Sequence, residues 1–343
     1  MLSERQRLIL NAVINDYIQT AEPVGSRSLA KRYHLGVSPA TIRNEMADLG
    51  EMGYLEQPHT SAGRIPSYKG YRYYVDCLME VEKLTPEEEE ELSQILQQRL
   101  ERIDTVFRQA SKALSNVSRY ISLVMSPFVG QQIFCEMRLI PLDAHYAIIL
   151  LFTDTGLVQN RIMEIPPGVL SAELDSIAQL FNRRLAGLPL EQINSIILQD
   201  IYQEFARKNE ALQQVIERLL ASLTYQSETE KVYLGGTTNI LRQPEFNNVE
   251  KVRGLLQVLE EQELLCELLT ADTSNEIAVI IGEENKCLPM KGCSIVTARY
   301  AVDGKLVGTI GILGPTRMDY PKVISVVEFM QKLLSETLQQ LIR

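Results

Sequence analysis

The pattern of apolar and polar positions in the first 35 residues predicts two helices. Ser3 and Gln6 form a capping box, which is typical of a helix start. The apolar positions that follow recur at helical spacing, at Leu10, Val13, Ile14, Tyr17 and Ile18. A break at 22–25 that contains proline and glycine separates this helix from a shorter one predicted over 26–34.

A third helix and a hairpin follow directly. Ser38 and Pro39 provide an N-cap and a first-turn proline, and Gly53 ends the helix. One face of this helix carries the apolar residues Ile42, Met46 and Leu49. Short strands predicted at 54–57 and 64–66 flank a turn-rich loop. Helix, helix, tight turn, helix and hairpin is the order of elements in a winged helix-turn-helix.

The remainder of the chain changes between strand-like and helical periodicity. Strands are predicted at 131–142, 144–153, 157–165, 231–234, 277–282, 293–302 and 305–313. Helices are predicted at 67–81, from residue 85 onward, at several places between 171 and 225, at 249–259 and at 321–342. A helix, strands, a helical interruption, strands and a final helix predict an α+β domain with a second domain inserted into it.

The distribution of charge is compatible with DNA binding by the N-terminal segment alone. The chain has a net charge of −10, but residues 1–74 carry nine basic and seven acidic residues and are therefore at +2. The rest of the chain is at −12. A mildly basic head on an acidic body fits a protein that presents one end to phosphates and keeps the other away from them.

Several classes of protein are disfavoured by the sequence. The longest apolar run, 146–152, is too short to cross a bilayer, and the N-terminus lacks the apolar core of a signal peptide, so we expect a cytoplasmic protein without a membrane partner. Five cysteines without a C-x-x-C pair or a neighbouring histidine predict reduced thiols and no metal site. We expect no cofactor.

The predicted third helix has the chemistry of a helix that reads bases. Its outward face carries Pro39 and Ala40, followed by Arg43 and Asn44. Arginine can donate a forked pair of hydrogen bonds to guanine, and asparagine can pair in the same way with adenine. The hydroxyls of Ser38 and Thr41, with the helix N-terminal amides, can hold phosphate. The alternative for Arg43 is a solvated surface arginine.

The predicted hairpin supplies the wing. Gly63 permits a tight tip, and Arg64 is placed to enter the minor groove or to hold phosphate. His59 in the loop and Lys69 after it complete the predicted DNA-binding set. A loop charge for Arg64 and an incidental loop residue for His59 are the alternatives left open.

Long segments of the chain closely resemble the HrcA family, the heat-inducible transcription repressors of bacteria. The resemblance lies in the segments EPVGSRSLAKRY, SPATIRNEMADLGEMGYLEQPHTSAGRIPS, KGYRYYVD, YLGGTTNIL, QPEF and GTIGILGPTRMDYPKVI. These strings are long and uncommon, stand in the family's order and span nearly the whole chain.

The resemblance implies a domain organisation and a mode of regulation. It implies a winged helix-turn-helix over 1–82, a GAF-like α+β domain over 83–166 plus 271–343, and a mostly helical dimerisation domain inserted over 167–270. It also implies repression of chaperone operons by a homodimer bound to double-stranded DNA at an inverted-repeat operator called CIRCE. Activity is implied to depend on the GroEL chaperonin. The reading helix falls on 38–52 and the wing on 57–65.

Two other functions are alternatives to repression. A ligand-sensing regulator would bind a small molecule in the GAF-like domain, but no polar cluster in the predicted strands identifies a ligand. An enzyme would need a phosphate cradle such as the glycines at 235–236 or at 308, 311 and 314. Neither set matches a P-loop or a dinucleotide-binding motif, so we expect no enzymatic activity.

Overall fold

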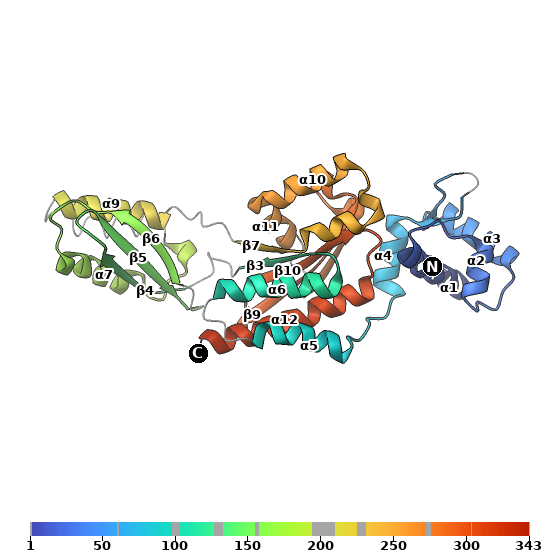
Figure 1. Cartoon of the computed structure of the whole chain (residues 1–343), viewed down its shortest axis with the longest axis horizontal. Helices are drawn as coiled ribbons and strands as arrows, with labels where there is room; N and C mark the ends of the chain where they lie inside the picture. Colours follow the sequence, from blue (N-terminus) through green and yellow to red (C-terminus); the bar gives the residue numbers. More distant parts are fainter. Residues whose placement is uncertain are drawn as a thin grey trace.

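The computed structural model describes residues 2–59, 62–97, 103–126, 133–154, 158–193, 210–224, 231–271, 276–302 and 304–342. These residues form a row of three parts, with an N-terminal head at one end, a central unit built on a five-stranded sheet, and a smaller unit at the other end (Figure 1). None of the described helices is both long enough and apolar enough to cross a membrane.

The head has the predicted order of elements. It consists of α1 (Glu4–Thr20), α2 (Ser26–Arg32), α3 (Pro39–Glu51), β1 (Leu55–Glu56), β2 (Ile65–Pro66) and α4 (Tyr68–Cys77). The predicted capping box at Ser3 is present, and α1 ends where Ala21 adopts a left-handed conformation. The two wing strands pair antiparallel, and Val24 bridges to Arg64 beside them. The winged helix-turn-helix prediction is confirmed at the level of its elements.

The central unit is an antiparallel sheet covered on both faces. Its strand order is β7-β3-β10-β9-β8. The strands are β3 (Ile121–Met125), β7 (Val232–Gly235), β8 (Ile277–Ile281), β9 (Cys293–Val302) and β10 (Lys305–Pro315). The helices are α5 (Pro86–Gln97), α6 (Ile103–Ser118), α10 (Val249–Glu260), α11 (Gln262–Thr270) and α12 (Tyr320–Ile342). Short 3-10 turns lie at Thr237–Arg242, Pro244–Phe246, Gly282–Glu284 and Leu288–Met290.

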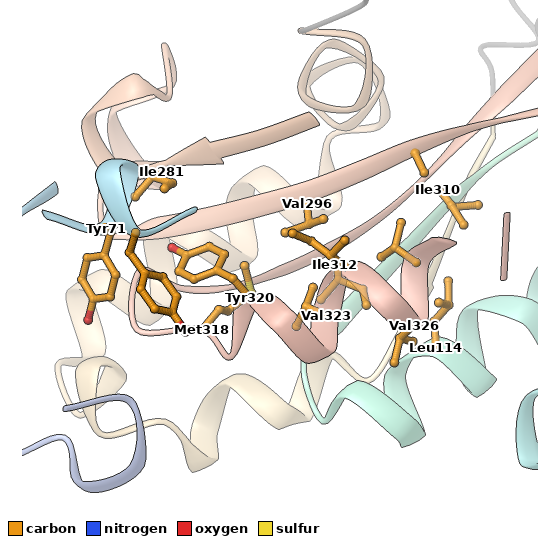
Figure 2. Packing of buried hydrophobic residues seen from close by; sticks show 14 of the residues in the cluster. Tyr71, Leu114, Ile281, Val296, Ile310, Ile312, Met318, Tyr320, Val323 and Val326 are labelled. Carbon is orange, nitrogen blue, oxygen red and sulfur yellow. The ribbon is translucent and has the colours of Figure 1, made fainter. Parts of the chain in front are cut away.

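Each face of the central sheet has its own hydrophobic core. On one face the sheet residues Val296, Ile310 and Ile312 pack against Val323 and Val326 of α12 (Figure 2). On the other face, residues of β3 and β9 pack against α10 and α11. All five residues of β3 are buried because this strand contributes to both cores. Both faces of the sheet are therefore filled by the protein's own side chains.

The third part is an independent unit with its own core. It contains the meander β4 (Phe134–Pro141), β5 (Tyr146–Thr153) and β6 (Val158–Glu164), with α7 (Ser171–Leu185), a short turn at Leu190–Gln192 and α9 (Glu210–Thr224). Both helices pack on the same face of the sheet. The chain leaves the central sheet after β3 and returns at β7, which is hydrogen-bonded to β3, so this unit is inserted between two neighbouring strands.

The insertion differs from the predicted boundaries. We expected strands 131–165 in the GAF-like domain and helices 249–259 in the insertion, but the strands lie in the inserted unit and the helices cover the central sheet. The alternating pattern of a strand shows which residues face a core, but it does not show which sheet the strand joins. Parts of the predicted segments, including 131–132, 155–157 and 194–209, lie outside the described residues.

Candidate nucleic-acid interface

The N-terminus of α3 is fixed by local hydrogen bonds. The Ser38 hydroxyl accepts the backbone N–H of Thr41 at 3.2 Å and lies 2.9 Å from the Thr41 hydroxyl. Pro39 occupies the first helical position, where its missing N–H has no cost. Ile42, Met46 and Leu49 are buried in the head, as predicted. These features hold the first turn of α3 in one conformation before any ligand arrives.

The opposite side of this first turn faces solvent. Pro39, Ala40, Arg43 and Asn44 are exposed together with Ser38, and Thr41 is half-buried. Within the described part of the chain, no hydrogen bond or ion pair engages the side chain of Arg43 or Asn44. Their donors and acceptors are therefore free to bind another molecule.

A buried carboxylate that the sequence analysis missed anchors α3 to α1. Glu45 lies on the inner side of α3, and the Arg5 guanidinium donates to its carboxylate with an Nε–Oε1 distance of 2.6 Å. A second pair joins Arg32 of α2 to the buried Asp16 of α1 at 2.6 Å, and this hydrogen bond raises the pKa of Arg32. Charged residues 16 to 40 positions apart carry no local signal of their pairing, so the sequence could not reveal these contacts.

The two halves of the exposed α3 surface differ in charge. Arg43 lies in the N-terminal half, whereas the exposed acids Asp48 and Glu51 lie toward the C-terminus. A polyanion would be attracted by the first half and repelled by the second. This matches the docking of recognition helices, whose N-terminal residues reach the base edges.

Two predicted DNA contacts lie instead at the C-terminal end of α3. The Lys69 ammonium donates to the Met52 carbonyl oxygen at 2.8 Å and stands 4.4 Å from the centre of the Tyr54 ring. The half-buried Arg64 places its guanidinium carbon 3.6 Å from the point where a Cβ on Gly50 would lie. Cations are favoured at this end of a helix because its carbonyl groups carry partial negative charge.

The wing also differs in detail from the prediction. Arg64 is at the base of the hairpin, where its backbone N–H and C=O pair with Val24 at 2.9 and 2.8 Å. Gly63 lies next to it, and a Cβ there would lie 2.4 Å from the Val24 carbonyl oxygen. The glycine is required by this close approach and not by a tight tip. His59 is exposed in the loop, whose residues 60–61 lie outside the described residues.

Hydroxyl groups of Ser67 and Tyr74 connect α4, the helix that follows the wing, to the rest of the head. Ser67 caps α4 and donates to the Gly53 carbonyl oxygen at 2.6 Å. The Tyr74 hydroxyl donates to Asn15 of α1 at 2.9 Å, and burial raises the pKa of this tyrosine to about 12. The end of α3, the wing and α4 are thus held as one piece.

The glycine motif at 235–239 serves packing. A Cβ on Gly235 would lie 2.3 Å from the Ser111 carbonyl oxygen, so the strand runs directly against α6. Asn239 donates to the Ser115 hydroxyl at 3.1 Å and closes the same turn. The close contact of Gly235 and the hydrogen bonds of Asn239 are made within the protein, which favours the structural interpretation of the motif over a phosphate cradle.

Comparisons with known proteins agree with these features. Residues 1–76 match the family described as the winged helix-turn-helix transcription repressor HrcA, DNA-binding, and residues 104–324 match the HrcA protein C terminal domain. The chain is 46% identical over 343 residues to the heat-inducible transcription repressor HrcA of Pelotomaculum thermopropionicum, which covers 100% of this chain and 98% of the relative. It is also 46% identical to HrcA of Moorella thermoacetica, over 100% of this chain and 99% of the relative.

The fold is also similar to that of a solved structure. A crystal structure at 2.2 Å resolution, described only as a hypothetical protein, superposes with a TM-score of 0.63 at 23% identity and covers 99% of both chains. This similarity supports the overall α+β architecture, with a winged helix-turn-helix at its N-terminus. The chain belongs to the HrcA family of heat-inducible transcription repressors and is not an enzyme.

Proposed function

We propose that this repressor binds the inverted-repeat operator CIRCE as a homodimer and depends on the GroEL chaperonin for its activity. The observation that carries the DNA-binding part is the exposed first turn of α3, where Arg43 and Asn44 have no partner among the described residues. These two side chains contact base edges in the major groove. Ser38, Thr41 and the backbone at Pro39 and Ala40 contact phosphate.

The wing and the end of α3 supply further contacts in this proposal. His59 is one of the exposed residues of the wing loop, and in this proposal it contacts the neighbouring DNA backbone. The Lys69 ammonium has three N–H donors, of which one is used by the Met52 carbonyl, so two are available to a phosphate. Arg64 binds phosphate from the base of the wing, a role that its half-buried position favours over insertion into the minor groove.

Dimerisation is supported by an apolar sheet face in the inserted unit. The resemblance implied a mostly helical dimerisation domain over 167–270, but the apolar stripes of the described helices in that range pack inside the two units. The sheet face opposite α7 and α9, called here the outer sheet face, instead carries Ile140, Ile148 and Ile162 side by side on three strands. Ile140 and Ile162 are exposed, as are Leu142 and Tyr146 at the same end of the sheet.

A second copy of the chain is the occupant that fits the outer sheet face. Its apolar centre is flanked by both signs of charge, since Arg138 and Glu136 lie on β4, where they pair at 2.8 Å, and Glu164 lies on β6. A two-fold axis brings a surface against itself, so a face that carries both charges is complementary to its own copy. Two identical heads then meet the two halves of an inverted repeat.

The dependence on chaperonin is inferred from the resemblance to HrcA. This dependence makes the repressor respond to heat. Unfolded proteins occupy the chaperonin, and less free chaperonin then remains to keep the repressor active. Both faces of the central sheet are filled by side chains, so the described part of the GAF-like fold offers no argument for a metabolite as the signal.

Gel-shift titrations of the full chain test the proposal. The ligands are an inverted-repeat duplex, a single half-site and a scrambled duplex, each at one fixed salt concentration and with or without purified GroEL. We expect the inverted repeat to bind about 100-fold more tightly than the half-site, because the second head binds intramolecularly. We also expect GroEL to raise the active fraction after mild heating. Equal affinity for the scrambled duplex would refute operator recognition.

A further inference from the structure

The head is joined to the central unit by an arginine that belongs to the head. Arg72 of α4 donates from Nε to the Glu284 carboxylate at 2.8 Å and from a terminal nitrogen to the Val279 carbonyl oxygen. A third contact, to Asp76 one turn along α4, orients the same guanidinium at 3.2 Å. Charge-assisted hydrogen bonds that use both edges of a guanidinium fix direction as well as distance.

A second arginine makes the reverse connection. Arg317 precedes α12 in the central unit and donates to the Ile18 carbonyl oxygen at the end of α1 in the head. Its Nε donates to Glu245 at 2.6 Å, which holds the guanidinium in place. The last turn of α1 contains no basic residue, so Arg317 supplies the positive charge and the donor that this helix end needs.

Tightly packed aromatic side chains lie in the same junction. The ring centres of Tyr71 in the head and Tyr320 in α12 are 6.1 Å apart (Figure 2). A Cβ on Gly282 would lie 2.1 Å from the Tyr68 ring, so this ring sits directly on the backbone after β8. One hydrophobic core runs from the head into the central unit through Tyr71 and Tyr320.

These contacts fix more than the distance between the two parts. A single contact allows a domain to swivel, whereas Arg72 and Arg317 hold two different helices of the head, α4 and α1. In Figure 1, α4 lies against the central unit and α3 lies farther out along the long axis. A small rotation at the junction therefore displaces the exposed turn of α3 by a larger distance.

We propose that Arg72 and Arg317 form an arginine clamp that sets the orientation of the head, and through it the half-site spacing that the dimer accepts. Both are positioning residues, because neither lies on the α3 surface that we assign to DNA. This inference rests on the proposed binding of a dimer to an inverted repeat. Half-sites on B-DNA are phased by its helical turn of about 10.5 base pairs, so a rigid head tolerates few spacings and a swivelling head tolerates many.

The spacing dependence of operator affinity is the test. The full chain and the double variant R72Q/R317Q are titrated with inverted repeats whose spacer is lengthened stepwise by up to half a helical turn. We expect the unmodified chain to lose about 100-fold in affinity at half a turn, since only one head remains bound. The variant loses less than about 5-fold over the same series, but binds the best spacing roughly 10-fold more weakly, because flexible heads lower the effective concentration of the second site.

Two controls separate positioning from folding. The half-site affinity of R72Q/R317Q remains within about 2-fold of the unmodified chain if its heads are intact. R253Q removes an exposed ion pair with Glu250 on α10 and leaves the spacing profile unchanged. Glu284→Gln is a second test that does not depend on the folding of the double variant. It weakens the clamp from the central unit but keeps an oxygen that can accept the Ile281 N–H. We expect it to give an intermediate spacing profile.

The outcomes are distinguishable. A spacing profile in R72Q/R317Q and Glu284→Gln as steep as that of the unmodified chain overturns the clamp. A parallel loss at the half-site overturns it as well, because the arginines would then support the head itself. If the unmodified chain shows no preference for an inverted repeat over scrambled DNA, it is the proposed function that fails.

Discussion

The exposed turn of α3 and the outer sheet face are both open to solvent, yet they differ in chemistry. On α3 the exposed groups are the polar side chains of Arg43 and Asn44, which have no partner among the described residues. On the sheet they are isoleucines, with Ile162 69% exposed. Desolvation of a polar group is favourable only when the ligand replaces each hydrogen bond to water. Burial of an apolar face is favourable against any complementary apolar surface.

Under the proposed function, this difference separates recognition from assembly within one chain. Sequence readout requires directional donors and acceptors, and these stand on a helix that buried residues and the Glu45–Arg5 ion pair hold in place. Assembly requires area, and the proposed dimer takes it from the sheet at the far end of the molecule (Figure 1). The two surfaces do not overlap, so a dimer formed through the inserted units leaves both heads free.

The largest effect is expected from a charge placed on the outer sheet face. Ile162→Asp puts a carboxylate in the apolar centre, where an unpaired charge costs several kcal/mol on burial. We expect sedimentation velocity to show a monomer, and affinity for the inverted repeat to fall by about 100-fold while half-site affinity is unchanged.

Val249→Asp is the matched control for this change. Val249 is 77% exposed at the first position of α10, where an acidic side chain is favourable at the helix start. The control is expected to remain a dimer with full operator affinity. If Ile162→Asp also remains a dimer, the two copies of the chain associate through another surface, and the outer sheet face is not the dimer interface.

A smaller effect is expected from a substitution on the exposed turn of α3. Arg43→Ala removes a forked donor and should cost about 1–3 kcal/mol at one base pair of the operator. The measurement is a competition assay over operators with single substitutions, with Arg7→Ala, an exposed change on α1, as the control. An equal loss on operator and random DNA would make Arg43 a phosphate contact and remove base reading from this position.

The sequence predicted the fold where local signals are strong. Capping residues and helical spacing predicted the helices of the head, and the turn-rich segment predicted the wing. It missed β3, because all five of its residues are buried and a strand buried on both faces shows no alternation. It also assigned β4 to β6 to the wrong unit, since the partner of a strand is decided by contacts far along the chain.

For the candidate site, too, the sequence predicted the local features but not the contacts between distant residues. The inner and outer faces of α3 follow from helical period alone, and the structure buries Ile42 and exposes Arg43 accordingly. The positions of Arg64 against Gly50 and of Lys69 on the Met52 carbonyl depend on how the wing and α4 fold back on α3. No local sequence pattern predicts that the wing and α4 pack against the end of α3.

The next effect tests whether the wing must lie close to the turn after α1. Gly63→Ala forces a Cβ into the Val24 backbone and should lower the free energy of unfolding of the head by about 1–3 kcal/mol. Thermal unfolding followed by circular dichroism measures the loss, with Gly292→Ala as the control because a Cβ there has open space. Equal stability of the two variants would show that the wing shifts without cost, and that its position relative to α3 is not fixed.

The smallest effect is expected from Lys69, which lies at the boundary of the polar surface and has an intramolecular role as well. Lys69→Met keeps most of the side-chain stem but removes the charge, so a phosphate contact predicts a similar loss of affinity for all DNA sequences and a salt slope reduced by about 1. Lys332→Met on α12 removes the same charge from the central unit, away from the head, and is expected to leave the slope unchanged. Should the slope stay constant while the head loses thermal stability, the ammonium serves only the carbonyl end of α3. The DNA-facing surface would then end at the N-terminal half of that helix.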